Sequence, residues 1–163
     1  MYRPNYDFKK DLIIAKETEK QIANFLIETQ DMTLIGTPET LPNVNRSDFD
    51  ARMKFNKSGK IVDIEIKEDK TCQYSTNIGV EYESWGRASG IAISKADFYL
   101  YKVHQPDGKK GVYIIQTNKL KEMIANELYH KTVVGGDKGS YSKNYLFRLD
   151  VVKENFKFLG YVD

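Results

Sequence analysis

The clearest alternation of apolar and polar residues lies between residues 48 and 68, and it predicts a β-hairpin. Two alternating runs, 48–55 and 61–68, flank a polar break at 56–60 that contains a glycine. Because side chains two residues apart share one face of a strand, each run has an apolar face and a charged face. We expect the apolar faces to be buried together, which gives the charged faces a fixed geometry.

The charged faces of this hairpin carry acidic and basic side chains. Asp50 lies on the charged face of the first run, and Glu65 and Lys67 lie on that of the second. A hairpin brings the three close together, and two carboxylates with an ammonium group suit a divalent-metal site that acts on phosphodiesters. A solvated strand face would show the same residue types, so the pattern alone is a hypothesis about chemistry.

A helix is predicted over residues 8–30, which contain no Gly or Pro. Its buried stripe follows helical spacing at Ala15, Ile22, Phe25 and Leu26. Asp7 is the expected N-cap. Glu19 lies beside the stripe. It is either a charged residue at the edge of the stripe or a carboxylate that points from the helix towards a metal site on the sheet.

The rest of the chain predicts strands, a second long helix and loops. Residues 32–35 are a strand or the end of a loop, and 36–47 form a loop rich in Pro, Gly and Asn. Strands are predicted at 77–83, 98–103, 111–116 and 145–149, the last of them the final strand. A helix capped by Asn118 or Thr117 is expected to run through about His130, and Asp150 is the expected cap of a short closing helix. Residues 84–91 and 135–140 are expected to be loops, the second of them flexible.

This order indicates a single α+β (α/β) domain over residues 1–163, with a central mixed β-sheet flanked by helices. The chain is 40% hydrophobic and 29% charged, as is common in globular domains. Its net charge of +2 neither indicates nor excludes a nucleic-acid partner.

The composition also bears on the compartment and on the histidines. No run of about 18 apolar residues predicts a membrane span, and no apolar signal-peptide segment follows Met1. Cys72 is the single cysteine, which excludes an internal disulfide and fits a reducing compartment. We therefore expect a cytoplasmic protein without a membrane partner. His104 and His130 lack ligand-like spacing and are expected to be structural or surface residues.

Asp50, the sequence Glu65-Ile66-Lys67 and the preceding helix with Glu19 resemble the PD-(D/E)XK nuclease superfamily, which includes restriction endonucleases, Holliday junction resolvases and phage exonucleases. Further stretches, over residues 77–83, 88–91 and 94–99 and at the late Gly-Gly loop with its Tyr-Leu strand, are similar to those of small phage-type members. The resemblance covers most of the chain, from about residue 12 to residue 149.

The sequence departs from the family pattern just before the acidic residue of the first strand. Phe49 stands where the pattern has Pro, so both Asp48 and Asp50 are candidate ligands. Asp50 is preferred because it begins the alternating strand and leaves a hairpin of suitable length. Asp48 stays an alternative.

The resemblance implies a restriction-endonuclease-like core and a nuclease that depends on Mg²⁺ or Mn²⁺. Asp50, Glu65 and the main-chain carbonyl of Ile66 would hold the metal, and Glu19 would bind through a metal-bound water or support a second ion. Lys67 would orient the attacking water or neutralise charge on the phosphoryl oxygens. The expected catalytic residues are thus Glu19, Asp50, Glu65 and Lys67, and the expected products carry a 5′-phosphate and a 3′-hydroxyl.

Four residues are candidates for substrate binding. Lys95, with Ser94 beside it, either contacts a phosphate or is a solvated lysine before a strand. Trp85 and Arg87 lie in a loop with Gly86 between them, which suits stacking on a base or wedging a junction. Alternatively, Trp85 closes over the core.

The expected activity is that of a bacteriophage-type, structure-selective DNA endonuclease, acting in the host cytoplasm if phage-encoded. A Holliday junction resolvase, which would require a two-fold homodimer, and an exonuclease are alternatives of the same class. A non-catalytic nucleic-acid-binding module with the same fold is the alternative of another class. The expected partner is DNA, branched or single-stranded.

Overall fold

A computed structural model describes residues 8–135 and 141–163. The expected N-cap Asp7 and most of the expected flexible loop, residues 136–140, lie outside the described residues. The helices are α1 (Phe8–Thr29), α2 (Cys72–Ser75), η1 (Gly90–Ala92), α3 (Thr117–Ala125) and α4 (Leu149–Asn155). The strands are β1 (Met32–Gly36), β2 (Ala51–Phe55), β3 (Ile61–Asp69), β4 (Asn77–Ser84), β5 (Arg87–Ala88), β6 (Phe98–His104), β7 (Lys110–Gln116), β8 (Lys131–Val134), β9 (Ser142–Arg148) and β10 (Lys157–Val162).

The strands of the described residues form two sheets. A six-stranded sheet has the order β1-β2-β3-β6-β7-β10, in which β3 and β6 pair in parallel and the other neighbours are antiparallel. A four-stranded antiparallel sheet has the order β5-β4-β9-β8. The structure confirms a mixed α+β fold with a mixed sheet flanked by helices. The second sheet was not predicted.

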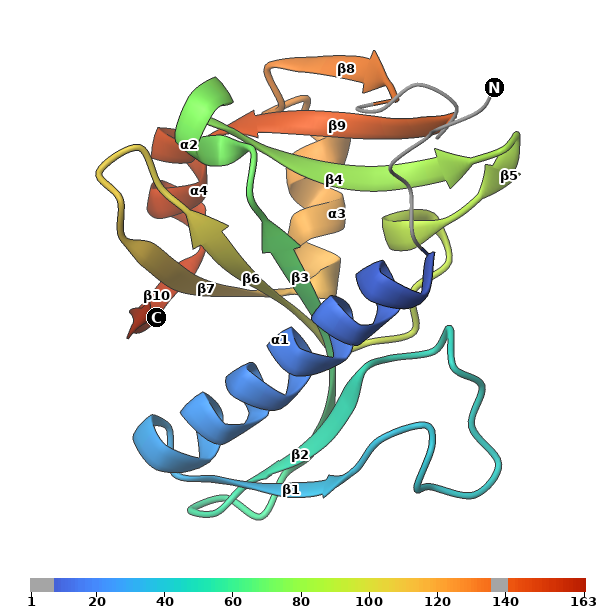
Figure 1. The fold of residues 1–163 in the computed structure, drawn as a ribbon, viewed down its shortest axis with the longest axis vertical. Helices are drawn as coiled ribbons and strands as arrows, with labels where there is room; N and C mark the ends of the chain where they lie inside the picture. The colour runs from blue at the N-terminus through green and yellow to red at the C-terminus, as the bar shows by residue number, and fades with distance from the viewer. Residues whose placement is uncertain (1–7, 136–140) are drawn as a thin grey trace.

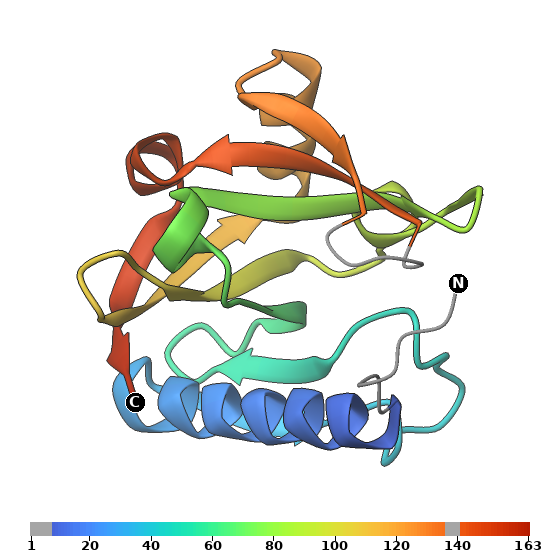
Figure 2. The same ribbon diagram turned by 45° about the horizontal axis from the view of Figure 1, so that its top comes forward.

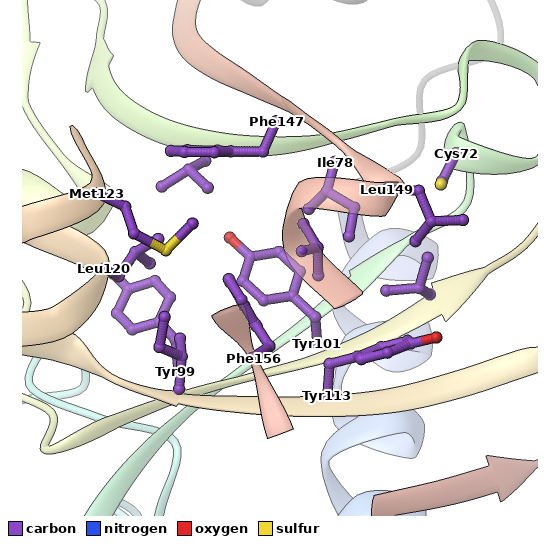
Figure 3. Packing of buried hydrophobic residues seen from close by; sticks show 14 of the residues in the cluster. Cys72, Ile78, Tyr99, Tyr101, Tyr113, Leu120, Met123, Phe147, Leu149 and Phe156 are labelled. Carbon is purple, nitrogen blue, oxygen red and sulfur yellow. The ribbon is translucent and has the colours of Figure 1, made fainter. Parts of the chain in front are cut away.

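The six-stranded sheet lies between two layers. Helix α1 covers one face over β1, β2 and β3, and the four-stranded sheet lies on the other side together with α3 and α4 (Figures 1 and 2). Alternation along β6 separates two cores. Leu100 packs in the core beneath α1, whereas Tyr99 and Tyr101 pack in the core between the sheets. Figure 3 shows Tyr101 among the aromatic side chains of this second core. Burying each large apolar side chain contributes about 1.5–3 kcal/mol to folding.

The predicted hairpin is present. β2 and β3 pair antiparallel with Ala51 opposite Ile64, and both residues are buried beneath α1. The connecting turn closes through the N–H of Phe55, which donates to the Lys60 carbonyl oxygen at 2.9 Å. Gly59 in this turn has a φ of +72°, a left-handed conformation that glycine adopts without strain. The polar break therefore reverses the chain as expected.

Helix α3 is shorter than predicted. Its N-cap is Gln116, not the predicted Thr117 or Asn118, which lie inside the helix, and it ends at Ala125 instead of near His130. A Schellman motif stops it: the N–H of Leu128 donates to the Met123 carbonyl oxygen at 3.0 Å, and the N–H of Glu127 donates to that of Ile124 at 3.0 Å.

The left-handed residue of this motif is Glu127, with a φ of +55°. Because glycine is the usual residue at that position, the sequence contains no signal for the end of the helix.

The end of the chain also differs from the prediction. The strand expected at 145–149 is β9, but β8 precedes it and β10 follows it, so it is not the last strand. Helix α4 begins at Leu149 with Arg148 as the N-cap, and Asp150 lies in its first turn. There the carboxylate of Asp150 favours the positive end of the helix dipole, without being the cap.

The uncertain segment 32–35 is part of strand β1. In the part of the chain that the structure describes, no helix is long and apolar enough to span a bilayer.

Candidate metal centre

The carboxylate of Asp50 lies where β2 separates from β3. The N–H of Asp50 donates to the Ile64 carbonyl oxygen at 2.9 Å, and its Oδ2 accepts the N–H of Ile66 at 2.7 Å. The Asp50 side chain therefore accepts the Ile66 N–H, which would otherwise bond a backbone carbonyl of the neighbouring strand. Since the N–H and C=O of one strand residue point to the same side, the Ile66 carbonyl also lies on the Asp50 side of β3.

Glu65 and Lys67 flank this point on the sheet face that meets the four-stranded sheet. They are level with Tyr99 and Tyr101 on the neighbouring strand β6, which belong to that core. Lys67 Nζ lies 2.8 Å from Glu65 Oε1, and the Glu65 side chain is only 15% exposed. Glu65 and Lys67 thus share one face of β3, as strand alternation predicted, and they form an ion pair there.

A cleft of about 370 Å³ lies between α1 and β3. Its walls are formed by Ala15, Thr18, Glu19, Asp50, Ile66, Lys67, Glu68 and Lys70. Glu19, Asp50 and Lys67, predicted from distant parts of the sequence, therefore share one cavity. Glu65 is not among the residues that line this cleft, but its partner Lys67 lines both it and a neighbouring cavity of about 190 Å³.

Negative charge dominates the cluster. Burial, and next the charge of Glu65, raise the pKa of Asp50 to about 7, against the opposing effects of the Ile66 N–H and of Lys67. Burial raises the pKa of Glu19 as well, and the nearby carboxylates of Glu39 and Glu65 add to this while Lys16 opposes it. A bound cation would relieve this repulsion.

Lys67 is the basic member of the cluster. Burial lowers the pKa of Lys67, but the charge and hydrogen bond of Glu65 outweigh this effect and bring it to about 12. The side chain is therefore an ammonium at neutral pH and acts as a fixed positive charge, not as a base.

The donor set fits a hard cation with few protein ligands. Asp50 Oδ1, Glu65 Oε2 and the Ile66 carbonyl oxygen offer oxygen atoms, the kind that Mg²⁺ prefers, and Mg²⁺ commonly keeps several waters beside one or two carboxylates. In residues 8–135 and 141–163, no group of three or more His, Cys, Asp or Glu side chains is arranged to hold a metal ion. Because its donors are all oxygen atoms and include no Cys or His, the set suits Mg²⁺ or Mn²⁺ better than a closed zinc site.

Asp48, the alternative ligand, is engaged elsewhere. Its Oδ2 accepts the N–H of Asn45 at 3.2 Å, and its Oδ1 lies 3.7 Å from Lys95 Nζ. Phe49, in the place of the family's proline, is buried beneath the guanidinium of Arg52, whose Cζ lies 4.9 Å from the ring centroid. Asp50 is thus the acid of this segment that reaches β3.

The residues predicted to bind substrate lie apart from the cleft. Lys95 and Ser94 line a different cavity, at the start of α3. Trp85 and Arg87 lie in the β4–β5 hairpin, which projects from one side of the molecule in Figure 1. The Trp85 side chain is 65% exposed and its ring centroid lies 4.5 Å from that of Tyr141. It does not close over the core.

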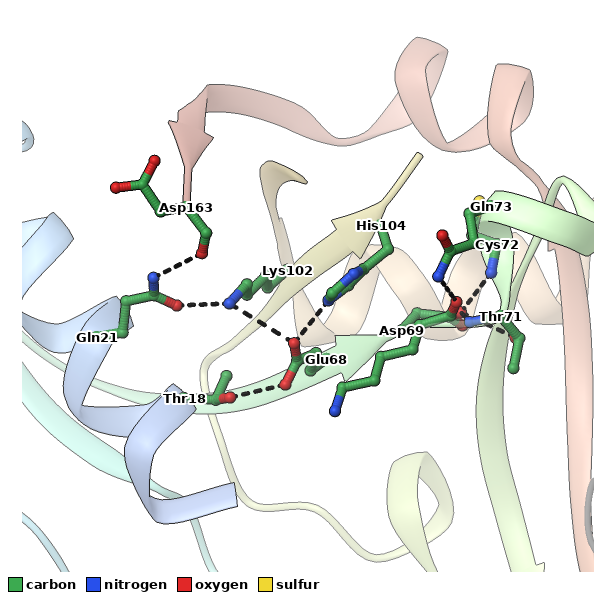
Figure 4. Close-up of polar contacts among 11 residues, drawn as sticks. Thr18, Gln21, Glu68, Asp69, Thr71, Cys72, Gln73, Lys102, His104 and Asp163 are labelled. Atoms are coloured by element: carbon green, nitrogen blue, oxygen red, sulfur yellow. Dashed lines mark hydrogen bonds and ion pairs between the residues drawn. The ribbon is translucent and has the colours of Figure 1, made fainter. Parts of the chain in front are cut away.

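The sequence pattern did not predict a buried polar network beside the cleft (Figure 4). Glu68 accepts a hydrogen bond from Thr18 Oγ1 at 2.7 Å, and its Oε2 lies 2.7 Å from His104 Nε2 and 3.6 Å from Lys102 Nζ. Lys102, only 6% exposed, also donates to Gln21 Oε1 at 2.6 Å. This network joins α1 to β3 and β6. Its one signal in the sequence is the strand alternation, which places Lys102 and His104 on the same face of β6.

His130 and Cys72, two further residues of reactive types, have no role in the cleft. His130 lies 3.2 Å from Arg148 through its Nδ1. Burial raises the pKa of the Cys72 thiol to about 11, so this side chain is a poor nucleophile.

No protein-family model, curated protein or solved structure matches this chain.

Proposed function

We propose that the protein is a Mg²⁺-dependent DNA nuclease that hydrolyses phosphodiester bonds and has a restriction-endonuclease-like core. The observation that carries this proposal is the convergence of Asp50, Glu65, Lys67 and the Ile66 carbonyl at one point of β3, with Glu19 on the opposite wall of the cleft. A half-buried carboxylate pair of this kind is costly for the fold and is typical of a functional site.

In this proposal Asp50, Glu65 and the Ile66 carbonyl hold Mg²⁺ or Mn²⁺. The metal ion supplies Lewis acidity and lowers the pKa of bound water. Lys67, an ammonium at neutral pH, stabilises negative charge on the phosphoryl oxygens and orients the water. Glu19, which lines the same cleft, would accept hydrogen bonds from water beside that site.

The preferred substrate is proposed to be branched or single-stranded DNA, cut by a phage-type, structure-selective endonuclease in the cytoplasm. Exposed Trp85, whose ring contacts that of Tyr141 at a tilt of 52°, offers an aromatic surface to an unpaired base. Holliday junction resolution by a homodimer and exonuclease action are the other modes of the same chemistry. A non-catalytic nucleic-acid-binding module would have no need of the half-buried Asp50 and Glu65 pair, which argues against that class.

The test is cleavage of labelled four-way junction, flap, duplex and single-stranded DNA, with Mg²⁺ and with EDTA. We expect Mg²⁺-dependent cutting by the wild type and a loss of about 10²–10³-fold in Lys67→Ala, the usual effect of removing one group that stabilises transition-state charge. The substrate cut fastest separates the endonuclease, resolvase and exonuclease modes.

Lys57→Ala is the matched control, because Lys57 is an exposed lysine in the β2–β3 turn. It should cut at the wild-type rate. If no DNA is cut and Mg²⁺ does not change the melting temperature, the proposal fails.

A further inference from the structure

A second cavity, of about 440 Å³, opens where α3 begins. It is separate from the cleft of the candidate metal centre, because no residue lines both. Its walls come from the starts of β3, β6 and α3, which meet where the N–H of Thr117 donates to the Asp97 carbonyl oxygen at 2.9 Å. In Figure 1 the first turn of α3 lies beside the start of β6.

The N-terminus of α3 faces this cavity without a side-chain cap. Gln116 is the N-cap residue and makes no side-chain cap hydrogen bond, and no acidic residue lies in the first turn. The N–H groups of Asn118 and Lys119 have no partner within the helix, because the first turn of a helix lacks preceding carbonyls. Such N–H groups and the positive end of the helix dipole favour an anion.

The hydroxyl of Thr117 is a second, independent indication of a ligand. Thr117 lines the cavity, is only 4% exposed, and its Oγ1 has no hydrogen-bond partner. An unpaired buried hydroxyl costs about 1–3 kcal/mol. A ligand oxygen that accepts this hydroxyl would remove that cost.

The charged side chains around the cavity are mainly basic. Lys60, Lys95 and Lys121 line it from three different elements, against one carboxylate, Asp97. Asp97 Oδ2 already accepts the N–H of Asp63 at 2.8 Å. The surroundings therefore favour a ligand with negatively charged oxygens.

We propose that this cavity is a phosphate-binding subsite, in which Thr117, the first N–H groups of α3, Lys60 and Lys121 hold one phosphate group. Phosphate provides several acceptor oxygens for these donors, and lysine ammonium groups bind it as point charges.

We assign the phosphate group to a DNA strand, an assignment that rests on the proposed nuclease function. β3 begins at the cavity with Ile61, and Glu65 lies four residues further along, about 13 Å at 3.3 Å per residue. A strand a few nucleotides long spans that distance. The subsite would then fix the register of the substrate in the cleft.

The experiment measures binding in EDTA, so that it does not depend on cleavage. In ¹H–¹⁵N spectra, sodium phosphate should shift the amide signals of Asn118 and Lys119, whereas sodium chloride at equal ionic strength should not. In fluorescence anisotropy with single-stranded DNA, Lys121→Ala should weaken binding and lower the salt slope by about one. Lys119→Ala, on the same helix but outside the lining of the cavity, is the matched control.

Thr117→Val tests the subsite without risk to folding, because valine has nearly the same shape as threonine and only the unpaired hydroxyl is lost. It should weaken phosphate binding without loss of melting temperature. Phosphate shifts without any effect of Lys121→Ala on DNA would support the subsite and overturn its assignment to a strand. Equal effects of Lys119→Ala and Lys121→Ala, or no amide shifts, would overturn the subsite itself. Phosphate shifts in a protein that cuts no DNA would leave the subsite standing and reject the nuclease.

Discussion

The Asp50 carboxylate lowers the stability of the fold, although the proposed activity requires it. The carboxyl is half-buried beside Glu65, and its pKa is raised to about 7, well above the ordinary 3.8. Because the folded pKa is the higher one, ionised Asp50 destabilises the fold fully above about pH 7. The effect disappears as the pH falls to 3.8, the pKa of Asp50 in the unfolded chain.

Asp50→Asn should therefore raise the stability of the metal-free protein while it abolishes cleavage. The amide oxygen of Asn can still accept the N–H of Ile66, and the repulsion from Glu65 is removed. We expect a gain of about 0.5–2 kcal/mol at pH 8, as for other substitutions that relieve a strained functional site, and a smaller gain at pH 5. Thermal unfolding in EDTA at the two pH values measures it.

Asp48→Asn is the control for this substitution, since Asp48 pairs with Lys95 and lies outside the cleft. It should give no gain. An Asp50→Asn protein that is less stable than wild type at pH 8 would contradict the repulsion argued here.

Single residues show both the success and the limit of sequence patterns. Asp50, Glu65 and Lys67 follow from alternation in one hairpin, because the two strands are neighbours in sequence and their faces are set by a period of two. The pairing of Glu68 with Thr18 crosses 50 residues and depends on where α1 docks, which no local pattern contains. The orphaned hydroxyl of Thr117 likewise becomes visible only in three dimensions.

Among the elements, α1 depends on a polar contact as well as on its apolar stripe. Thr18, 8% exposed, donates to Glu68, and this is a charged acceptor. Burial raises the pKa of Glu68, but the hydrogen bonds of His104 and Thr18 and the charge of Lys102 outweigh it, so the net pKa is lowered. Glu68 is therefore ionised when it holds α1 against the sheet.

Thr18→Val should destabilise the protein by about 1.5–3 kcal/mol, the usual worth of a hydrogen bond to a charged group. Urea unfolding monitored by circular dichroism measures the change. Thr29→Val in the same helix is the control, because the exposed Thr29 hydroxyl bonds only residues near it in sequence: it donates to the Phe25 carbonyl oxygen and accepts a long bond from Gln30 Nε2. Equal losses in the two variants would show that the bond to Glu68 does not hold α1.

Elements with a strong local period were predicted well, and those defined by distant partners were not. α1 and the hairpin match their predicted ranges closely. β10 was missed because a bulge between Phe158 and Gly160 interrupts its alternation, and because Phe158 is 45% exposed. Which strands pair was also beyond the sequence, since alternating strands such as β4 suit either sheet.

In the molecule as a whole, the last segment completes both cores. Phe156, 6% exposed, packs edge-to-face on Tyr101 in the core between the sheets, with ring centroids 6.2 Å apart. Leu159 and Val162 of β10 pack against the core beneath α1. The two cores are thus coupled through one short stretch of chain.

Phe156→Ala should destabilise the whole protein by about 3–5 kcal/mol, a large part of the 5–15 kcal/mol that a domain of this kind has. The loss should appear in one cooperative transition that fluorescence and circular dichroism report alike. Phe158→Ala, the substitution of a half-exposed ring two residues later, is the control and should cost clearly less. Separate transitions for the two probes would show that the cores unfold independently.

The position of β10 has a consequence for synthesis on the ribosome. α1 leaves the exit tunnel early, yet Gln30 Nε2 bonds the Leu159 carbonyl oxygen and Gln21 Nε2 bonds that of Asp163, 142 residues away in sequence. Until those residues emerge, part of the apolar core beneath α1 and the open edge of β7 are exposed to solvent. Translation pauses between the codons of β9 and those of β10 would prolong that exposure, and recruitment of chaperones to the nascent chain would be concentrated there.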